Sequence, residues 1–266
     1  MTEYVFIIDL DGTIIGNCYY QALLFRIEHI FKKNNIKINI NDHLNNAYKK
    51  KNKLLRPYFL FFISEMKKRF PNSYFYVYTA SDKKWALREI ATIEKQNNFK
   101  FDRPIFSRSD CIKGSDNCYK KSVNKILKKK HKNAEILIID DNDVFIDYAD
   151  NIVKCPSYDY IYFEDLWFHI NEKNLHLPEV KNLMSELKEG NLIAPYPIKC
   201  SNMSQKLETY KWFAEKCTSI NKTNNCDDNF WKNLTKIIIK NNINEFNKKS
   251  VKKINNYFTQ YLLLKA

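Results

Sequence analysis

Arginine is scarce in this chain, which holds only 6 Arg beside 38 Lys. Because the planar guanidinium of Arg is the usual choice for bidentate phosphate recognition, the sequence offers little for an arginine-based anion site. Glycine is scarcer still, with 4 residues, whereas Asn occurs 32 times. This skew is typical of the coding bias of an AT-rich genome, so part of the net charge of +14 reflects base composition. A merely solvated basic surface and an anionic partner such as RNA, DNA or an acidic phosphopeptide both stay open.

Paired cysteines and long apolar runs are absent as well. The seven cysteines form no C-x-x-C pair, and such an odd, scattered set is typical of free thiols in a reducing compartment and argues against a zinc site. No apolar run approaches the roughly 20 residues that span a membrane, and the first residues form a strand instead of a signal peptide. We therefore expect a soluble, intracellular protein of the cytoplasm or nucleus, with no membrane partner.

The periodicity of apolar residues predicts an α/β protein. Apolar runs over residues 5–8, 74–78 and 136–139 are typical of buried strands. Helical patterns alternate with them over 18–33, from Pro57 onward, over 82–96 and over 120–130. Ser81 is expected to cap the third of these helices. Strands that alternate with helices predict a Rossmann-like parallel sheet with helices on both faces.

The pattern changes near residue 165. We expect one α/β domain over 1–165, with residues 18–55 as a small helical insert or minimal cap after the first strand. Residues 166–266 lack strand–helix alternation, are rich in Asn and Lys, and carry +7, half of the net charge. We interpret them as a basic helical extension of unknown role, and recruitment of a substrate or partner is a hypothesis that rests only on this composition.

Two carboxylates, Asp9 and Asp11, stand where the first strand ends, followed by Gly12 and Thr13. Side chains in extended backbone alternate with a period of two, so both carboxylates face the crevice in which open α/β sheets bind ligands. One can attack phosphorus while its neighbour handles the proton, which indicates phosphoryl transfer. The alternative, a solvated Asp-Gly turn, explains Asp11 and Gly12 but not a second Asp.

The other strand ends carry the further groups that this chemistry requires. Thr79 follows the second strand, and Asp140 and Asp141 follow the third. Neighbouring strand ends of a parallel sheet line one crevice, so we expect these groups to converge. Asp9 is then the nucleophile that forms an aspartyl-phosphate, and Asp11 is the general acid and base. Thr79 would hydrogen-bond a phosphoryl oxygen.

So many carboxylates beside a phosphate require a cation, and Mg²⁺ suits an all-oxygen site. Its expected ligands are the acidic residues of the strand ends: Asp9, Asp11 through its backbone carbonyl, Asp140 and Asp141. The alternative for the last two is an acidic turn without metal. A lysine should neutralise the remaining charge, and Lys120 and Lys121 are the candidates.

Together these residues resemble the haloacid dehalogenase (HAD) superfamily, and several motifs resemble its FCP/SCP-type phosphatases, which act on the C-terminal domain of RNA polymerase II. The shared motifs are Arg56-Pro57, Tyr78-Thr79-Ala80-Ser81, Phe106-Ser107-Arg108, Cys118-Tyr119-Lys120-Lys121 and Ile138-Ile139-Asp140-Asp141. The resemblance covers about residues 1–160 and implies a Mg²⁺-dependent phosphatase whose catalytic lysine is Lys121. We expect Thr79, Lys121, Gly12 and Thr13 to bind the phosphate.

Three departures from the family's pattern bear on the substrate. Gly12 stands where the family more often has Glu, a helical stretch over 18–55 replaces a short strand-rich insert, and 166–266 matches no segment of the family. Substrate access and specificity for phosphoserine peptides are therefore separate questions from phosphatase chemistry.

Several functions are compatible with these motifs. The first is a phosphatase acting on phosphoserine or phosphothreonine in proteins. A polynucleotide end phosphatase would suit the charge of +14, but such enzymes commonly show Thr-Asn-Gln in place of Thr79-Ala80-Ser81. A small-molecule phosphatase is a further alternative. A HAD-fold scaffold that only binds a partner would have no need of the intact catalytic set.

Overall fold

A computed structural model describes residues 2–36, 40–114, 118–127, 130–162, 177–179, 181–182 and 228–263. The chain forms two compact units. The first unit comprises Met1–Gly16, Leu55–Asp159 and Asp227–Ala266, and the second comprises Asn17–Leu54 and Tyr160–Cys226.

A parallel sheet is the centre of the first unit. Its strands are β1 (Tyr4–Ile8), β2 (Ser73–Val77), β5 (Glu135–Asp140) and β6 (Ile152–Lys154). They lie in the order β2-β1-β5-β6, and each neighbouring pair is parallel. Ile8 at the end of β1 lies beside Val77 of β2 and Ile139 of β5. The predicted α/β fold is confirmed, and the three predicted strands are direct neighbours.

Helices and one short hairpin make up the rest of the described chain. The helices of the first unit are α3 (Phe59–Arg69), α4 (Lys83–Asn97), α5 (Val123–Leu127), α8 (Phe230–Lys240) and α9 (Lys248–Leu263). The hairpin consists of β3 (Ile112–Lys113) and β4 (Tyr119–Lys120), and short 3-10 turns are η2 (Arg108–Asp110) and η3 (Ala149–Asn151). In the second unit are α1 (Tyr19–Lys33), α2 (Asn41–Ala47) and η1 (Lys50–Asn52).

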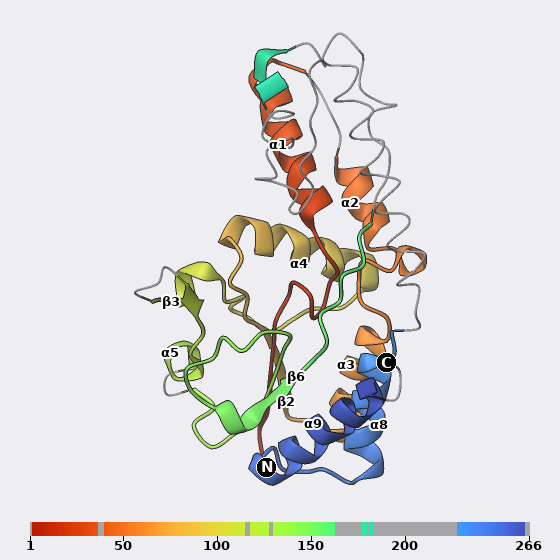
Figure 1. The fold of residues 1–266 in the computed structure, drawn as a ribbon, viewed down its shortest axis with the longest axis vertical. Coiled ribbons are helices and arrows are strands. Elements are labelled where there is room, and N and C mark those ends of the chain that lie inside the picture. Colours follow the sequence, from red (N-terminus) through yellow and green to blue (C-terminus); the bar gives the residue numbers. More distant parts are fainter. Residues whose placement is uncertain are drawn as a thin grey trace. The chain divides into compact units, whose positions relative to one another are not determined.

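Helices cover both faces of the sheet, as predicted (Figure 1). On one face, Val5 and Ile7 of β1 belong to a buried cluster that includes the apolar side of α5. On the other face, Phe6 stacks on Phe75 of β2 with ring centroids 4.7 Å apart and meets Phe62 of α3 edge-on. A strand buried on both faces has apolar residues at every position, which explains the unbroken run in β1.

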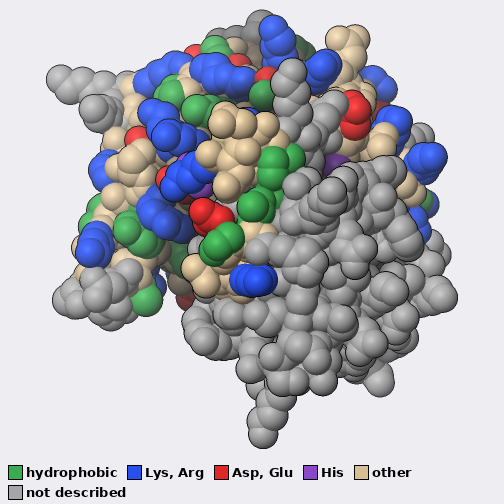
Figure 2. All heavy atoms as spheres, turned by 90° about the horizontal axis from the view of Figure 1, so that it is seen from above, with side chains coloured by type: hydrophobic (Ala, Val, Ile, Leu, Met, Phe, Trp, Pro, Cys, Tyr) green, Lys and Arg blue, Asp and Glu red, His purple; other side chains and the backbone are tan. Residues whose placement is uncertain are grey.

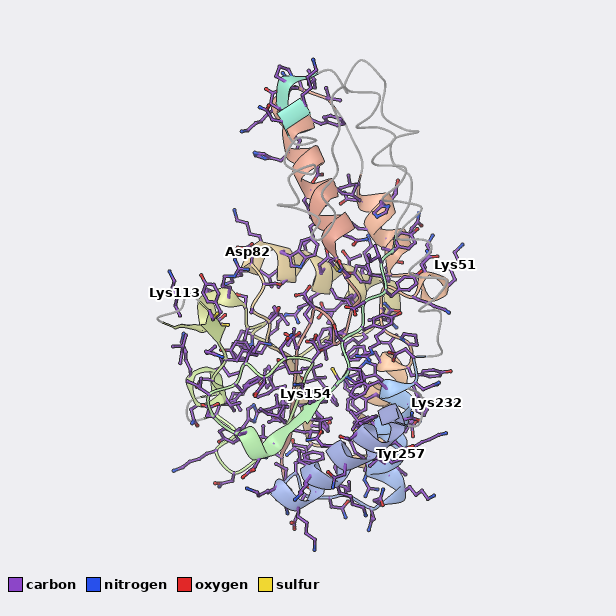
Figure 3. The ribbon with its side chains drawn as sticks, viewed as in Figure 1. Lys51, Asp82, Lys113, Lys154, Lys232 and Tyr257 are labelled. Carbon is purple, nitrogen blue, oxygen red and sulfur yellow. The ribbon has the colours of Figure 1, made fainter. Side chains whose placement is uncertain are left out.

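Two helix starts differ from those predicted. Asp82 caps α4 instead of Ser81: its carboxylate accepts hydrogen bonds from two amides of the first turn at 2.9 and 3.4 Å. Asp82 lies at the exposed beginning of the helix (Figure 3), whereas the Ser81 hydroxyl bonds to a carboxylate at the strand ends. The helix expected from Pro57 begins two residues later, because Tyr58 has a left-handed backbone with φ of 64°.

The helix predicted over 120–130 is also shorter, since α5 begins only at Val123. The carboxylate of Asp147 accepts the Val123 amide at 2.8 Å and so fixes this start. Lys120 belongs to β4. Residues 128–129 of the predicted helix lie outside the described residues.

The helices α8 and α9, which lie in the predicted extension 166–266, belong to the first unit (Figure 1). Trp231 of α8 is fully buried, and its ring centroid lies 5.1 Å from that of Phe59 and 4.8 Å from that of Phe62, both in α3. Asn255 of α9 hydrogen-bonds the backbone of β6 at 2.8 and 3.2 Å and thereby covers this edge strand. These helices are thus built into the core of the sheet unit.

The second unit is helical where it is described. Gln21 of α1 is buried and donates to the Tyr162 carbonyl at 3.1 Å, and the Asn17 amide donates to the Tyr160 carbonyl at 2.8 Å. Residues 17–21 are therefore hydrogen-bonded to residues 160–162 within this unit. Across both units, no helix of the described residues is long and apolar enough to cross a membrane.

Candidate active site

The carboxyl ends of three adjacent strands bring predicted site residues to one edge of the sheet. Asp9 directly follows β1, and Asp140 is the last residue of the neighbouring β5. Thr79 comes two residues after β2, on the other side of β1. The Asp9 amide donates to the Ile139 carbonyl at 2.9 Å, so the backbone at this position is held by the sheet itself. All three side chains are buried.

Lys121 reaches this edge from a loop outside the sheet. Its backbone pairs with residues 144–146 through hydrogen bonds of 2.8 and 3.0 Å, which fixes the position of the side chain. Its Nζ donates to Asp9 Oδ1 at 2.5 Å and to Asp140 Oδ2 at 2.7 Å. Of the two candidate lysines, Lys121 is therefore the one at the strand ends, while Lys120 is half-buried in β4.

The buried charges at this edge shift each other's protonation. Burial alone would lower the pKa of Lys121, but the carboxylates of Asp9 and Asp140 outweigh it and hold the pKa above its usual value, so the ammonium stays charged. Burial raises the pKa of Asp9 well above its usual value; the Lys121 charge opposes this, while Asp140 and Asp11 add to it. One cation thus serves more than one buried carboxylate, and the site has a surplus of negative charge.

Two hydroxyl groups hold the carboxylate of Asp11. Thr79 Oγ1 donates to Asp11 Oδ2 at 3.2 Å, and Ser81 Oγ donates to the same oxygen at 2.6 Å. The Ser81 amide in turn donates to Thr79 Oγ1 at 3.0 Å. Ser81 was predicted only as a helix cap. A signal was present, because Ser81 follows Thr79 by two positions, the same spacing that places Asp9 and Asp11 together.

A cluster of three carboxylates could hold a metal ion. One oxygen from each of Asp9, Asp140 and Asp141 lies within 4.8 Å of the other two. Opposite ligands of an octahedral Mg²⁺ are about 4.2 Å apart, because the Mg–O distance is about 2.1 Å. Burial raises the pKa of Asp141 and the charge of Asp140 adds to the shift, so a bound cation would favour the charged carboxylate. The donor set and the charge both fit Mg²⁺, with the carboxylate of Asp11 outside the cluster.

Gly12 and Thr13 lie against the metal-ligand candidate Asp141. Thr13 is fully buried, and its Oγ1 lies 3.4 Å from Asp141 Oδ1 and 3.4 Å from Cys155 Sγ. Gly12 has φ of +76°, and a Cβ at this position would stand 2.5 Å from Asp141 Oδ2. Glycine is therefore required here twice, by backbone conformation and by space.

Arg56 is the largest charged side chain buried near the site, with only 1% of its surface exposed. Its Nη1 donates to the Gly12 carbonyl at 3.3 Å and to Cys155 Sγ at 3.7 Å. Its Nε and Nη2 donate to the two carboxylate oxygens of Asp228 at 3.0 and 2.9 Å. The sequence marks Arg56 only as part of the Arg56-Pro57 motif, and Asp228 lies 172 positions away with no local signal to mark it.

Comparison with known proteins identifies one family. The family model described as NLI interacting factor-like phosphatase matches residues 4–190, while no curated protein matches the chain. The match extends beyond the expected 1–160 and includes the start of the segment 166–266, so the expectation that this whole segment lies outside the family was wrong. Among solved structures, the chain is similar to Fcp1, described as an essential RNA polymerase II CTD phosphatase, with 17% identity and a TM-score of 0.39 over 95% of this chain and 69% of that chain. The chain is also similar to a variant of fission yeast Fcp1 bound to beryllium fluoride, with 15% identity and a TM-score of 0.38 over 94% of this chain and 69% of that chain. These structural similarities are weak, so the family match alone bears on function.

Proposed function

Because this chain belongs to the NLI interacting factor-like phosphatase family, and is therefore a phosphoric monoester hydrolase of the HAD type, we propose that it hydrolyses phosphoserine and phosphothreonine in proteins through an aspartyl-phosphate on Asp9. The observation that carries the proposal is the position of Lys121 between Asp9 and Asp140 at the carboxyl ends of β1 and β5. A carboxylate nucleophile needs its charge balanced in this way before an anionic phosphoryl group can approach it.

In the first half of the reaction, a carboxylate oxygen of Asp9 attacks phosphorus, and the bond from phosphorus to the seryl or threonyl oxygen breaks. Asp11 gives a proton to that leaving oxygen. The hydroxyls of Thr79 and Ser81 hold Asp11 at this side of the site. Lys121 balances the negative charge of the transferred group, which is the electrostatic part of the catalysis.

In the second half, Asp11 takes a proton from water, and the water oxygen attacks phosphorus. The bond between phosphorus and Asp9 breaks, which releases phosphate and restores the carboxylate. Asp11 has then regained the proton that it gave to the leaving oxygen, and it has acted as both acid and base. Its half-buried position suits this role, since the leaving group departs to solvent and the water enters from it, whereas Asp9 and Lys121 are buried.

Asp9, Asp140 and Asp141 would hold Mg²⁺ in this reaction, as proposed from their oxygen cluster. When bound, Mg²⁺ neutralises charge on the phosphoryl oxygens and orients the group for attack. Asn142 supports this arrangement: its amide donates to Asp140 Oδ1 at 2.8 Å, and its side chain donates to Asp141 Oδ1 at 2.8 Å.

A second candidate substrate is a phosphate end of a polynucleotide. It is favoured by the net charge of +14 and by the described surface seen in Figure 2, on which Lys and Arg side chains outnumber Asp and Glu. The segment Thr79-Ala80-Ser81 favours phosphoprotein, because polynucleotide phosphatases of this superfamily commonly have Thr-Asn-Gln there. Here the Ser81 hydroxyl also donates a hydrogen bond to Asp11, and a Gln at position 81 would have to supply this bond instead.

Phosphate release from an aryl phosphate tests the chemistry. The purified chain is assayed with Mg²⁺ and with EDTA, beside the variant Asp9→Asn. We expect activity that requires both Mg²⁺ and Asp9. Phosphoserine peptides are then compared with oligonucleotides that carry an end phosphate, and a higher kcat/KM for the oligonucleotide would transfer the proposal to nucleic acid. A folded protein that binds Mg²⁺ but releases no phosphate from any of these would favour the scaffold alternative.

A further inference from the structure

The ion pair between Arg56 and Asp228 links the C-terminal helices to the catalytic loop. Arg56 is buried, and its guanidinium packs against aromatic rings, with its carbon 4.8 Å from the ring centroid of Phe230 and 5.3 Å from that of Tyr158. Among the described residues, Asp228 forms an ion pair with this buried cation. The two parallel N–H···O bonds of 3.0 and 2.9 Å form a bidentate pair, which fixes the plane of the guanidinium as well as its position.

Arg56 holds the loop that carries the general acid. Its Nη1 donates to the carbonyl of Gly12, the residue after Asp11. Its own amide donates to the Ile14 carbonyl at 2.8 Å, and Leu55 forms a bridge with Ile15. The loop over residues 12–15 is thus held at Gly12 by the side chain of Arg56 and at Ile14 and Ile15 by the backbone of residues 55–56.

Asp228 is itself fixed by α8. Its Oδ1 accepts the amide of Phe230, the first residue of the helix, at 3.2 Å. The position of α8 is in turn set by Trp231, which is buried against α3. A continuous series of contacts therefore runs from the α8 start through Asp228 and Arg56 to Gly12.

We propose that Asp228 is a positioning residue for catalysis. It orients Arg56, and Arg56 holds in place the loop that carries Asp11. The segment around residue 228, which no match to the family model covers, then completes the active site instead of only extending the fold. The effect on turnover rests on the proposed phosphatase function, but the effect on the loop does not.

Asp228→Asn keeps the shape of the side chain and removes its charge. Among the described residues, the buried guanidinium then loses its counter-charge and its bidentate partner, so it no longer holds the Gly12 carbonyl. We expect kcat to fall roughly 10- to 100-fold, because small displacements of a reacting group have effects of that size, while KM changes little. Hydrogen exchange of the amides over residues 9–16 should be at least about ten-fold faster than in the unchanged protein. Asp228→Glu, which keeps the charge, should restore much of both.

Arg69→Ala is the matched control. Arg69 Nη2 donates to Asn242 Oδ1 at 2.7 Å and to Asn244 Oδ1 at 2.6 Å, so it also ties the C-terminal segment to the sheet unit. Arg69 ends α3 just before β2 begins, which places this contact at the amino ends of the strands, opposite the site. Its loss should lower the melting temperature without a change in kcat or in exchange over residues 9–16.

The outcomes separate the two proposals. Faster exchange over residues 9–16 in Asp228→Asn supports the positioning role even if no substrate is turned over by the unchanged protein, a result that would count against the proposed function alone. A folded Asp228→Asn protein with unchanged exchange and unchanged kcat would overturn the positioning role. So would an Arg69→Ala protein that loses as much kcat as Asp228→Asn, since the effect would then come from general loosening of α8 and α9.

Discussion

Ser81 donates its hydroxyl hydrogen to Asp11 Oδ2 across 2.6 Å, in a turn where its amide also bonds to the side chain of Thr79. Two hydroxyls from the end of β2 therefore hold one oxygen of the proposed general acid. This leaves the other carboxylate oxygen for proton exchange with the substrate. The Thr-Ala-Ser segment thus serves Asp11 as well as the phosphate that Thr79 was predicted to bind.

Ser81→Ala removes the shorter of these two hydrogen bonds. We expect kcat to fall about three- to ten-fold, because Asp11 keeps Thr79 but is less firmly oriented, a loss comparable to one hydrogen bond of about 1 kcal/mol. KM should be nearly unchanged. Steady-state assays on an aryl phosphate measure both, with Ser81→Thr as the variant that retains the hydroxyl. Equal kcat in Ser81→Ala and the unchanged protein would show that this bond has no part in proton transfer.

Lys121→Met should be far more damaging than Lys120→Met. Removal of the Lys121 charge leaves Asp9 and Asp140 buried side by side, and breaking a buried ion pair in this way typically costs about 3–5 kcal/mol of the free energy of unfolding. Turnover should be lost, because the nucleophile and the phosphoryl group would repel each other. Urea unfolding and phosphate release measure the two effects. If Lys120→Met were the worse of the two, the assignment of Lys121 would be wrong.

The parts of the site that follow strand ends could be predicted from the sequence. Asp9, Thr79 and Asp140 follow recognisable apolar runs, and parallel strands end at a shared edge, so their convergence follows once the strands are adjacent. Lys121 was a harder case, since its position depends on pairing with residues 144–146 in a loop. Only the resemblance to a family distinguished Lys121 from Lys120 in the sequence.

The parts held by long-range contacts could not be predicted. Asp228 is set against Arg56 by the packing of α8 on α3, and nothing near either residue in the sequence marks the pair. The cap of α4 was predicted at Ser81 because Ser and Asp are both good caps, and the choice of Asp82 depends on Asp11 engaging Ser81. Tertiary contacts thus decided between two local possibilities.

Mg²⁺ should stabilise the protein through the cluster of Asp9, Asp140 and Asp141. A ligand that binds only the folded state raises the melting temperature. At a concentration of 100 times its Kd, it adds about 2.7 kcal/mol to the free energy of unfolding. Asp141→Asn removes one charged ligand and should weaken this effect as well as phosphatase activity. Thermal unfolding with and without MgCl₂ tests it without any substrate. A melting temperature that rises equally in both proteins would mean that Mg²⁺ binds elsewhere.

Gly12→Ala should affect both stability and metal binding. With φ of +76° an Ala is strained, at a cost of about 1–3 kcal/mol, and its Cβ would stand 2.5 Å from Asp141 Oδ2 and displace that carboxylate. The control is Asn98→Ala, at the end of α4, where φ is 48°. Both variants should lose stability in urea unfolding, but only Gly12→Ala should lose the Mg²⁺-dependent rise in melting temperature. The same loss in Asn98→Ala would attribute it to backbone strain in general.

Cys155 should make the stability of the protein fall at high pH. Burial raises the pKa of its thiol from 9.0 to about 12, with the nearby Arg56 charge opposing the shift. Between these values the unfolded chain loses the thiol proton while the folded protein keeps it, so raising the pH favours unfolding.

The slope is about 1.4 kcal/mol per pH unit above pH 9, since one pKa unit corresponds to that free energy. Below pH 9 the thiol is protonated in both states and contributes no slope. Cys155→Ala lacks this term but shares every other titrating group. Urea unfolding in reducing buffer, at about pH 8 and about pH 10.5, should therefore show a loss of stability roughly 2 kcal/mol larger in the unchanged protein than in Cys155→Ala. An equal loss in the two proteins would place the Cys155 thiol in contact with water, at odds with its burial beside Arg56 and Thr13.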